Sequence, residues 1–195
     1  MKTRNVSILL ALVFVIASVA FASEIPSPAI GSRIEEFSLP DVNGTERSLK
    51  SLAGKNGTVL LFIAVQCPVS NAYNERMEQL AQEYKAKGIA VVGINSNVAE
   101  DAAAVKAHAA EHKLSFPILK DPGNKVADKL GASVTPEAYF LDTNNRLLYH
   151  GRIDNSRNAA RVETSDLRNA LDAALSGKPV EKTEAKAFGC TIKRG

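Results

Sequence analysis

The sequence predicts an α/β fold in which helices flank both faces of a mixed central sheet. A continuous apolar run from Thr58 to Val65, bounded by turn residues, is typical of a strand that is buried on both faces. Helical and strand patterns then alternate along the first half of the chain. In the second half, two β-type segments within residues 137–150 are joined by a short polar turn, which favours an antiparallel hairpin.

The other elements follow from local patterns. Asn43-Gly44 is a turn dipeptide between two short alternating stretches, which predicts a hairpin. Asn97, followed by Glu100, resembles a capping box at the start of a helix. The predicted elements in chain order are a hairpin over residues 34–50, a strand over 58–65, a helix over 68–87, a strand over 89–95, a helix that ends near 113, a strand over 116–119, a helix over 124–130, strands over 137–141 and 146–150, and a helix over 165–175.

The first 22 residues have the pattern of a secretory signal peptide. Lys2 and Arg4 precede an apolar run over residues 6–20, and a small-x-small cleavage site ends at Ala22. The run is short for a membrane span, and an uncleaved N-terminal anchor is the alternative. We therefore expect a secreted or periplasmic protein that is cut near Ala22 and has no stable membrane span in its mature form.

Residues 23–177 are predicted to form one domain, and residues 178–195 form a charged tail that carries Cys190. This length suits a single hydrophobic core. Without Lys2 and Arg4 the formal net charge falls from +3 to +1. The excess of basic over acidic residues therefore lies largely in the signal peptide and the tail, and no nucleic-acid partner is expected.

Cys67 is the strongest candidate for a reactive residue because it lies where the buried strand ends and a helix begins. The first N–H groups of a helix have no intrahelical partner and carry the positive end of its dipole, so they stabilise a thiolate. Pro68 supports this placement, since proline is favoured at the first helical position. Cys67 would then be the N-cap, with Ser70 in the first turn. The alternative interpretation is a small, buried, apolar cysteine.

The chain has two cysteines, Cys67 and Cys190, and predicted export would allow a disulfide between them. Such a bond would tie the tail back onto the strand–helix junction. Cys190 has three interpretations: a resolving thiol for Cys67, half of a structural staple, or a free thiol in the tail. A disulfide requires the two Cα atoms to lie within about 7 Å of each other.

Three segments give the chain a resemblance to the thioredoxin fold, and within it to exported redoxins of the AhpC/TSA and TlpA-like kind. Residues 66–70, Gln-Cys-Pro-Val-Ser, follow the central strand where this group keeps Cys-x-x-Cys or Cys-x-x-Ser. Residues 134–138, Val-Thr-Pro-Glu-Ala, match the segment that holds a cis-proline, and residues 88–95 match the strand after the active-site helix. The likeness covers roughly residues 30–175, and the tail around Cys190 also resembles tails of exported redoxin-like proteins.

The resemblance implies a thiol–disulfide oxidoreductase that uses Cys67 as its nucleophile and needs no cofactor. It implies that Pro136 is cis and lies against Cys67, and that the backbone of its neighbour Thr135 pairs with a bound peptide or thiol. The expected partners are protein or small-molecule thiols and disulfides, or peroxides, together with an external reductant. In the resolving interpretation, Cys190 closes a disulfide with Cys67 after the first attack.

The sequence also departs from the related groups. Ser70 stands where thioredoxins have their second cysteine, so no local disulfide can form. Peroxiredoxins have a hydroxyl residue three positions before the nucleophile and a proline seven before it, where this chain has Ala64 and Leu60. A thiol peroxidase is therefore the first alternative function. A non-catalytic copper-binding module is the alternative of another class, but the paired cysteines of such carriers are absent from the motif.

Four further residues have two interpretations each. Arg152 would supply positive charge near the thiolate or pair with a surface carboxylate. Glu137 would move protons near the thiol or stand in water at the end of a strand. His108 and His112 fit the H-x-x-E-H pattern of some zinc peptidases, but no third ligand is evident. A surface helix with two histidines is favoured, so no metal is expected.

Overall fold

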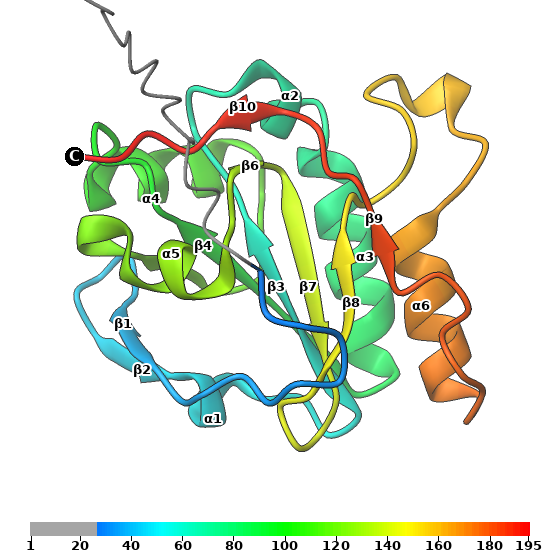
Figure 1. The fold of residues 1–195 in the computed structure, drawn as a ribbon. Coiled ribbons are helices and arrows are strands. Elements are labelled where there is room, and N and C mark those ends of the chain that lie inside the picture. The colour runs from blue at the N-terminus through cyan, green and yellow to red at the C-terminus, as the bar shows by residue number, and fades with distance from the viewer. Residues whose placement is uncertain (1–26) are drawn as a thin grey trace, which may run out of the picture.

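The computed structural model describes residues 27–195. The predicted signal peptide, residues 1–22, lies outside this range and stays a prediction. Among the described residues, no helix is both long enough and apolar enough to cross a membrane. The central sheet has six strands in the order β5 (Ile118–Lys120), β4 (Ile89–Asn95), β3 (Gly57–Phe62), β7 (Glu137–Leu141), β8 (Leu147–Gly151) and β9 (Glu184–Ala185) (Figure 1).

The sheet is mixed, as predicted. β4 runs parallel to β3 and to β5, whereas β7 runs antiparallel to β3 and to β8. β3 is central, and all six of its residues are buried. Val59 and Leu61 pack into the core on one face of the sheet, and Leu60 and Phe62 pack into the core on the other. The apolar run therefore reflects burial on both faces, as expected for a central strand.

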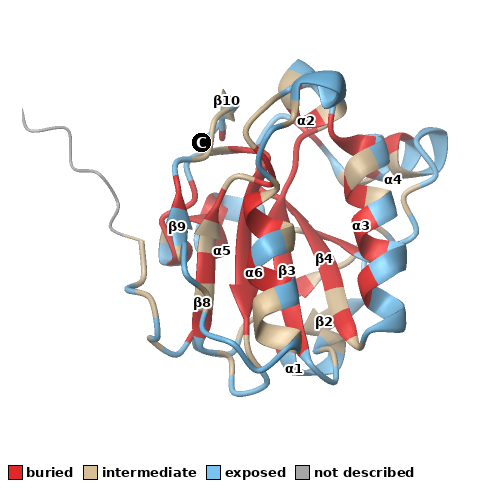
Figure 2. Cartoon of the chain, turned by 90° about the vertical axis from the view of Figure 1, so that its right-hand side faces the viewer, coloured by how far each residue is buried: buried red, intermediate tan, exposed pale blue. Residues whose placement is uncertain are grey.

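Helices cover both faces of this sheet. Figure 2 shows the buried residues concentrated on the strands and on the inner sides of the helices. One face carries α3 (Asn74–Ala86), α4 (Ala102–Glu111) and α6 (Asp166–Leu175). The other face carries β1 (Ser38–Pro40), β2 (Glu46–Ser48), α1 (Leu49–Leu52) and α5 (Lys125–Leu130). Two short 3-10 helices, η1 (Pro122–Asn124) and η2 (Ala159–Arg161), lie in connections.

The single helix predicted after the central strand is in fact two helices, α2 (Pro68–Asn71) and α3. Side chains of α2 bond to the loop that follows β3. The Ala64 N–H donates to Ser70 Oγ at 3.2 Å, and Asn71 Nδ2 donates to the Val65 carbonyl at 2.9 Å. These bonds hold the first turn against the end of the sheet, and the chain changes direction before α3 begins.

The predicted capping box is wrong. The helix after β4 begins at Ala102 and is capped by Asp101, whose Oδ1 accepts the N–H of Ala104 at 2.7 Å. Glu100 is instead buried, and its carboxylate accepts N–H groups of the loop that precedes Cys67. The predicted box placed the cap at Asn97, four residues before the true cap, because the sequence does not reveal that Glu100 is taken up by a distant loop.

The tail returns to the body of the protein and contributes two short strands. β9 extends the sheet beside β8, and β10 (Cys190–Thr191) pairs antiparallel with β6 (Val134–Thr135). Ile192 is 3% exposed and belongs to the core beneath β10. Neither strand was predicted from the sequence, because a two-residue strand has no measurable periodicity.

Candidate active site around Cys67

Cys67 lies at the N-cap of α2, as predicted, and is 3% exposed. Its backbone is extended, and its sulfur accepts the N–H of Ser70 at 3.2 Å. The thiol also lies 3.2 Å from the backbone carbonyl of Thr135, to which it donates. Pro68 occupies the first helical position. The strand–helix junction thus places the sulfur between the start of α2 and strand β6.

The Thr135–Pro136 peptide bond is cis, which confirms the expectation for Pro136. Thr135 is 2% exposed, and its carbonyl points to the Cys67 sulfur. Ser70 is also buried. Its backbone N–H bonds to the Cys67 sulfur, while its hydroxyl accepts the N–H of Ala64. The structure therefore brings Cys67, Ser70, Thr135 and Pro136 together.

Cys190 joins this group through the pairing of β10 with β6. The register sets Cys190 opposite Thr135, and β10 also contacts α2 (Figure 1). The Cys190 thiol lies near enough to Cys67 to influence its pKa, and both cysteines are free thiols. Gly189 allows this close approach, since a Cβ there would lie 1.9 Å from the Thr135 carbonyl oxygen.

Hydrogen bonding makes Cys67 the more acidic of the two thiols. Burial raises the pKa of Cys67, but hydrogen bonds from Cys190, from the Thr135 side chain and from the Ser70 N–H together outweigh it, so the pKa lies below the ordinary value. The hydrogen bond with Cys67, together with burial, raises the pKa of Cys190. These opposite pKa shifts suit Cys67 to act as a thiolate nucleophile and Cys190 to act as a protonated partner.

Glu137 does not stand in water, so that interpretation is wrong. Its carboxyl group is buried, with Oε1 2.6 Å from Nε2 of His150 and Oε2 accepting the N–H groups of Ser133 and Val134. These bonds tie the carboxylate to the backbone that leads into β6. No hydrogen bond joins Glu137 to either cysteine among residues 27–195.

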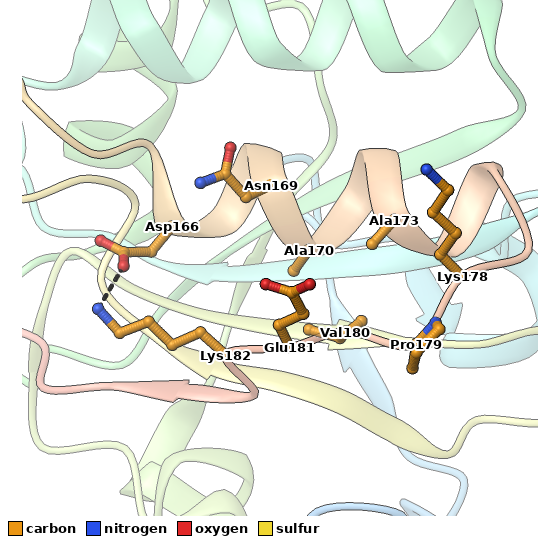
Figure 3. Close-up of a pocket in the computed structure, with 9 residues that line it drawn as sticks. All are labelled: Asp166, Asn169, Ala170, Ala173, Lys178, Pro179, Val180, Glu181 and Lys182. Atoms are coloured by element: carbon orange, nitrogen blue, oxygen red, sulfur yellow. Dashed lines mark hydrogen bonds and ion pairs between the residues drawn. The ribbon is translucent and has the colours of Figure 1, made fainter.

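Arg152 pairs with a carboxylate, as one interpretation expected, but that carboxylate is buried rather than on the surface. Arg152 Nε donates to Asp166 Oδ2 at 2.7 Å, and Lys182 Nζ donates to Asp166 Oδ1 at 2.6 Å. The Asp166 side chain is 2% exposed. Figure 3 shows the Asp166–Lys182 pair beside a cavity of about 270 Å³ between α6 and the tail, which neither cysteine lines. Arg152 therefore helps to anchor the tail.

The two histidines of the H-x-x-E-H pattern lie on α4. The Nε2 atom of His108 lies 3.1 Å from Nδ2 of Asn74, and its ring centroid lies 4.3 Å from that of His112. Within the described part of the chain, no three His, Cys, Asp or Glu side chains are grouped as metal ligands. His108 thus packs α4 against α3.

Sequence reasoning missed the role of Glu100 at this site. Glu100 lies beneath the loop before Cys67 and accepts the N–H groups of Val65 and Gln66, both at 2.9 Å. The only signal was its spacing from Asn97, which resembled a helix cap. A buried carboxylate that bonds a loop distant in sequence leaves no local pattern.

A central strand that ends at a cysteine, a helix that begins there and a cis-proline beside the sulfur define a thioredoxin-fold redoxin. A secreted disulfide oxidoreductase of Mycobacterium tuberculosis, homologous to DsbE, shares this fold. It has a TM-score of 0.55 at 21% identity and covers 70% of this chain and 95% of that one. The chain belongs to the AhpC/TSA family, whose model matches residues 30–150.

Two further relatives resemble the chain. Thiol-disulfide oxidoreductase ResA of Halalkalibacterium halodurans is 30% identical over 118 residues. The match covers 60% of this chain and 65% of that protein, just under two thirds of its length. The crystal structure of a hypothetical protein from Sinorhizobium meliloti has a TM-score of 0.81 at 36% identity and covers 87% of this chain and 97% of that one.

Proposed function

We propose that the chain is an exported thiol–disulfide oxidoreductase in which Cys67 is the nucleophile and Cys190 is the resolving thiol. The β10–β6 register carries this proposal, because it sets Cys190 opposite the residue whose carbonyl contacts Cys67, Thr135. The lowered pKa of Cys67 supports its role as the attacking group. The similarity to a relative named thiol-disulfide oxidoreductase supports the same chemistry.

The reaction proceeds through two thiol–disulfide exchanges. The Cys67 thiolate attacks one sulfur of a substrate disulfide, forming a mixed disulfide and releasing the other sulfur as a thiolate. That thiolate takes up the Cys190 proton, directly or through water. The Cys190 thiolate then attacks Cys67 Sγ, forming the Cys67–Cys190 bond and releasing the second substrate thiolate. Two electrons pass from the protein to the substrate, and an external dithiol reductant restores both protein thiols.

The surrounding residues position these sulfurs. The Ser70 N–H stabilises the thiolate, and Pro68 begins the helix that presents this N–H group. Thr135 and Pro136 flank the sulfur on the side where β10 pairs. Because β10 bonds to this backbone, a peptide substrate would have to displace part of the tail to pair there.

The proposed partners are protein or small-molecule disulfides and an external reductant, in a secreted or periplasmic setting. The signal peptide pattern of residues 1–22 supports export. Two cysteines placed as a redox pair suit an oxidising compartment, where thiols and disulfides exchange.

Peroxide reduction is a second candidate, because the AhpC/TSA family match favours it. In that reaction the Cys67 thiolate breaks the O–O bond, giving a sulfenic acid and water or an alcohol. Cys190 then condenses with the sulfenic acid, releasing water and forming the same disulfide. The absence of a hydroxyl at position 64 argues against this candidate, because Ala64 offers no hydrogen bond to a peroxide near the sulfur.

A turnover assay with excess dithiol separates the two functions. We expect the chain to reduce a protein disulfide and a small disulfide, and Cys67→Ser to be inactive. When the dithiol is left out, Cys190→Ser should accumulate the mixed disulfide. The proposal fails if Cys67→Ser retains full activity. Faster consumption of hydrogen peroxide than of either disulfide would establish the peroxidase instead.

A further inference from the structure

The loop before Cys67 rests on a buried carboxylate. Glu100 is 2% exposed. Its Oε2 accepts the Val65 N–H at 2.9 Å, and its Oε1 accepts the Gln66 N–H at 2.9 Å. These two residues immediately precede Cys67, so the carboxylate determines where the backbone enters α2. Neither carboxylate oxygen bonds to the Cys67 sulfur, so Glu100 acts on the thiol through the backbone.

Asn97 connects this carboxylate to the segment that directly follows β10, the strand that carries Cys190. Its Nδ2 donates to Glu100 Oε1 at 3.0 Å, and its Oδ1 accepts the N–H of Lys193 at 2.8 Å. The N–H of Val98 donates to the Lys193 carbonyl at 3.0 Å, which completes the contact between the two segments. A short series of hydrogen bonds therefore joins the loop of one cysteine to the strand of the other.

The groups around Glu100 are joined by further hydrogen bonds, and the Glu100 carboxyl group is ionised. Asn95 Nδ2 donates to Glu100 Oε2 at 2.5 Å, while Lys120 Nζ donates to Asn95 Oδ1 at 2.5 Å and to the Asn97 carbonyl at 3.1 Å. Burial raises the pKa of Glu100, but its four hydrogen bonds outweigh that effect and lower it. A buried charge with four donors holds one geometry, because any displacement leaves a donor without a partner.

We infer that Glu100 and Asn97 are positioning residues that hold the Cys190 strand in register with the Cys67 loop, and so set how readily the two thiols meet. Neither residue touches a sulfur, and their effect is geometric. A well-placed intramolecular group reacts far faster than a free one, and small displacements reduce that advantage. The redox consequence rests on the proposed function, whereas the placement of Cys190 can be tested without it.

The first experiment measures the reduction potential in glutathione buffers, where protein dithiol and glutathione disulfide exchange with protein disulfide and two glutathione molecules. We expect Asn97→Ala to lower the equilibrium constant about tenfold, which raises the reduction potential by about 30 mV. Asn155→Ala is the matched control. Its Oδ1 also accepts backbone N–H groups from another part of the chain, those of Glu163 and Thr164. It bonds to neither of the segments that carry the cysteines. If Asn97 had only a structural role, both substitutions would lower the free energy of unfolding, and the reduction potential would not differ between the two variants.

The second experiment needs no disulfide. In a Cys67→Ser background, Cys190 is alkylated with a bulky maleimide. We expect Glu100→Ala and Asn97→Ala to accelerate alkylation about tenfold, whereas Asn155→Ala leaves it unchanged. Glu100→Ala is the sharper variant, because the hydrogen bonds of Glu100 go to Val65, Gln66, Asn95 and Asn97 and none to the tail. Asn97→Ala serves if Glu100→Ala does not fold.

The outcomes separate the inference from the proposed function. If the folded Asn97→Ala variant matches Asn155→Ala in the alkylation of Cys190, the inference is wrong. If the wild-type chain forms no Cys67–Cys190 disulfide in glutathione while the alkylation pattern appears, the proposed function fails and the inference stands.

Discussion

At the scale of single residues, Cys67 is acidic because of its immediate neighbours rather than because of a long helix. α2 has only four residues, so it contributes little beyond the N–H groups of one turn. The Ser70 N–H donates to this sulfur, and hydrogen bonds from the Thr135 side chain and from Cys190 also lower its pKa. Residues 67–70 were recognisable in the sequence because they are adjacent. Cys190 was not placed, because its contact depends on the path of the whole tail.

The pH dependence of Cys67 alkylation tests the contribution of Cys190. Only the thiolate reacts, so the rate rises as pH rises through the pKa. We expect a midpoint below that of an ordinary thiol, about 8.5. Cys190→Ala should shift this midpoint upward, because it removes a donor to the thiolate, and Cys190→Ser should lie between because it keeps a hydroxyl. Mass spectrometry of the Cys67 peptide measures the rates, and identical midpoints in all three proteins would exclude this contribution.

At the scale of elements, the pairing of β10 with β6 creates the two-cysteine site. The long apolar and amphipathic segments were predictable because many residues repeat one pattern. Two-residue strands were not, and neither was the capping of α4 by Asp101 in place of the predicted Asn97–Glu100 box. The division of the helix after Cys67 also depends on side-chain bonds to a loop, which no periodicity records.

Gly189→Ala tests the strand pairing directly. The added methyl group would meet the Thr135 carbonyl, which is backbone and cannot move aside freely. We expect β10 to separate from β6, and the rate of Cys67–Cys190 disulfide closure to fall by about 100-fold. Rapid oxidation followed by trapping of free thiols measures this rate. Gly195→Ala is the control, since a Cβ there meets only Val98 at an ordinary 3.6 Å, and equal rates in the two variants would contradict the pairing.

At the scale of the whole molecule, the tail is part of the fold. β9 completes the sheet, Ile192 lies in the core, and Lys182 bonds to the buried Asp166 on α6. The sequence predicted the mixed sheet and its covering helices from residues before 176. The attachment of the tail was not predictable, because charged residues such as Lys182 show no preference for one distant carboxylate over another.

Asp166→Asn measures how strongly that attachment stabilises the protein. Burial raises the pKa of Asp166, but hydrogen bonds and charge interactions with Arg152 and Lys182 outweigh it, so the pKa is lowered. Its stabilisation is therefore present above the pKa of the unfolded state, about 3.9, and is lost as pH falls further. We expect the variant to lower the free energy of unfolding by about 2 kcal/mol at neutral pH.

Urea unfolding at neutral and acidic pH checks this prediction. The difference between Asp166→Asn and wild type should shrink as pH falls below about 4 and through the lowered pKa of the folded protein, where the wild-type carboxyl group becomes protonated. Glu163→Gln is the control for removing an exposed carboxylate and should change the free energy of unfolding by less than about 0.5 kcal/mol. A pH-independent difference for Asp166→Asn would show that charge is not the cause.

The central claim is that the fold brings Cys67 and Cys190 together as one redox pair. A non-reducing peptide map of the chain, after equilibration with glutathione disulfide at low protein concentration, tests it most directly. We expect one intramolecular crosslinked peptide that joins Cys67 to Cys190 and disappears on reduction. Separate glutathione adducts on the two cysteines, with no crosslinked peptide, would contradict it.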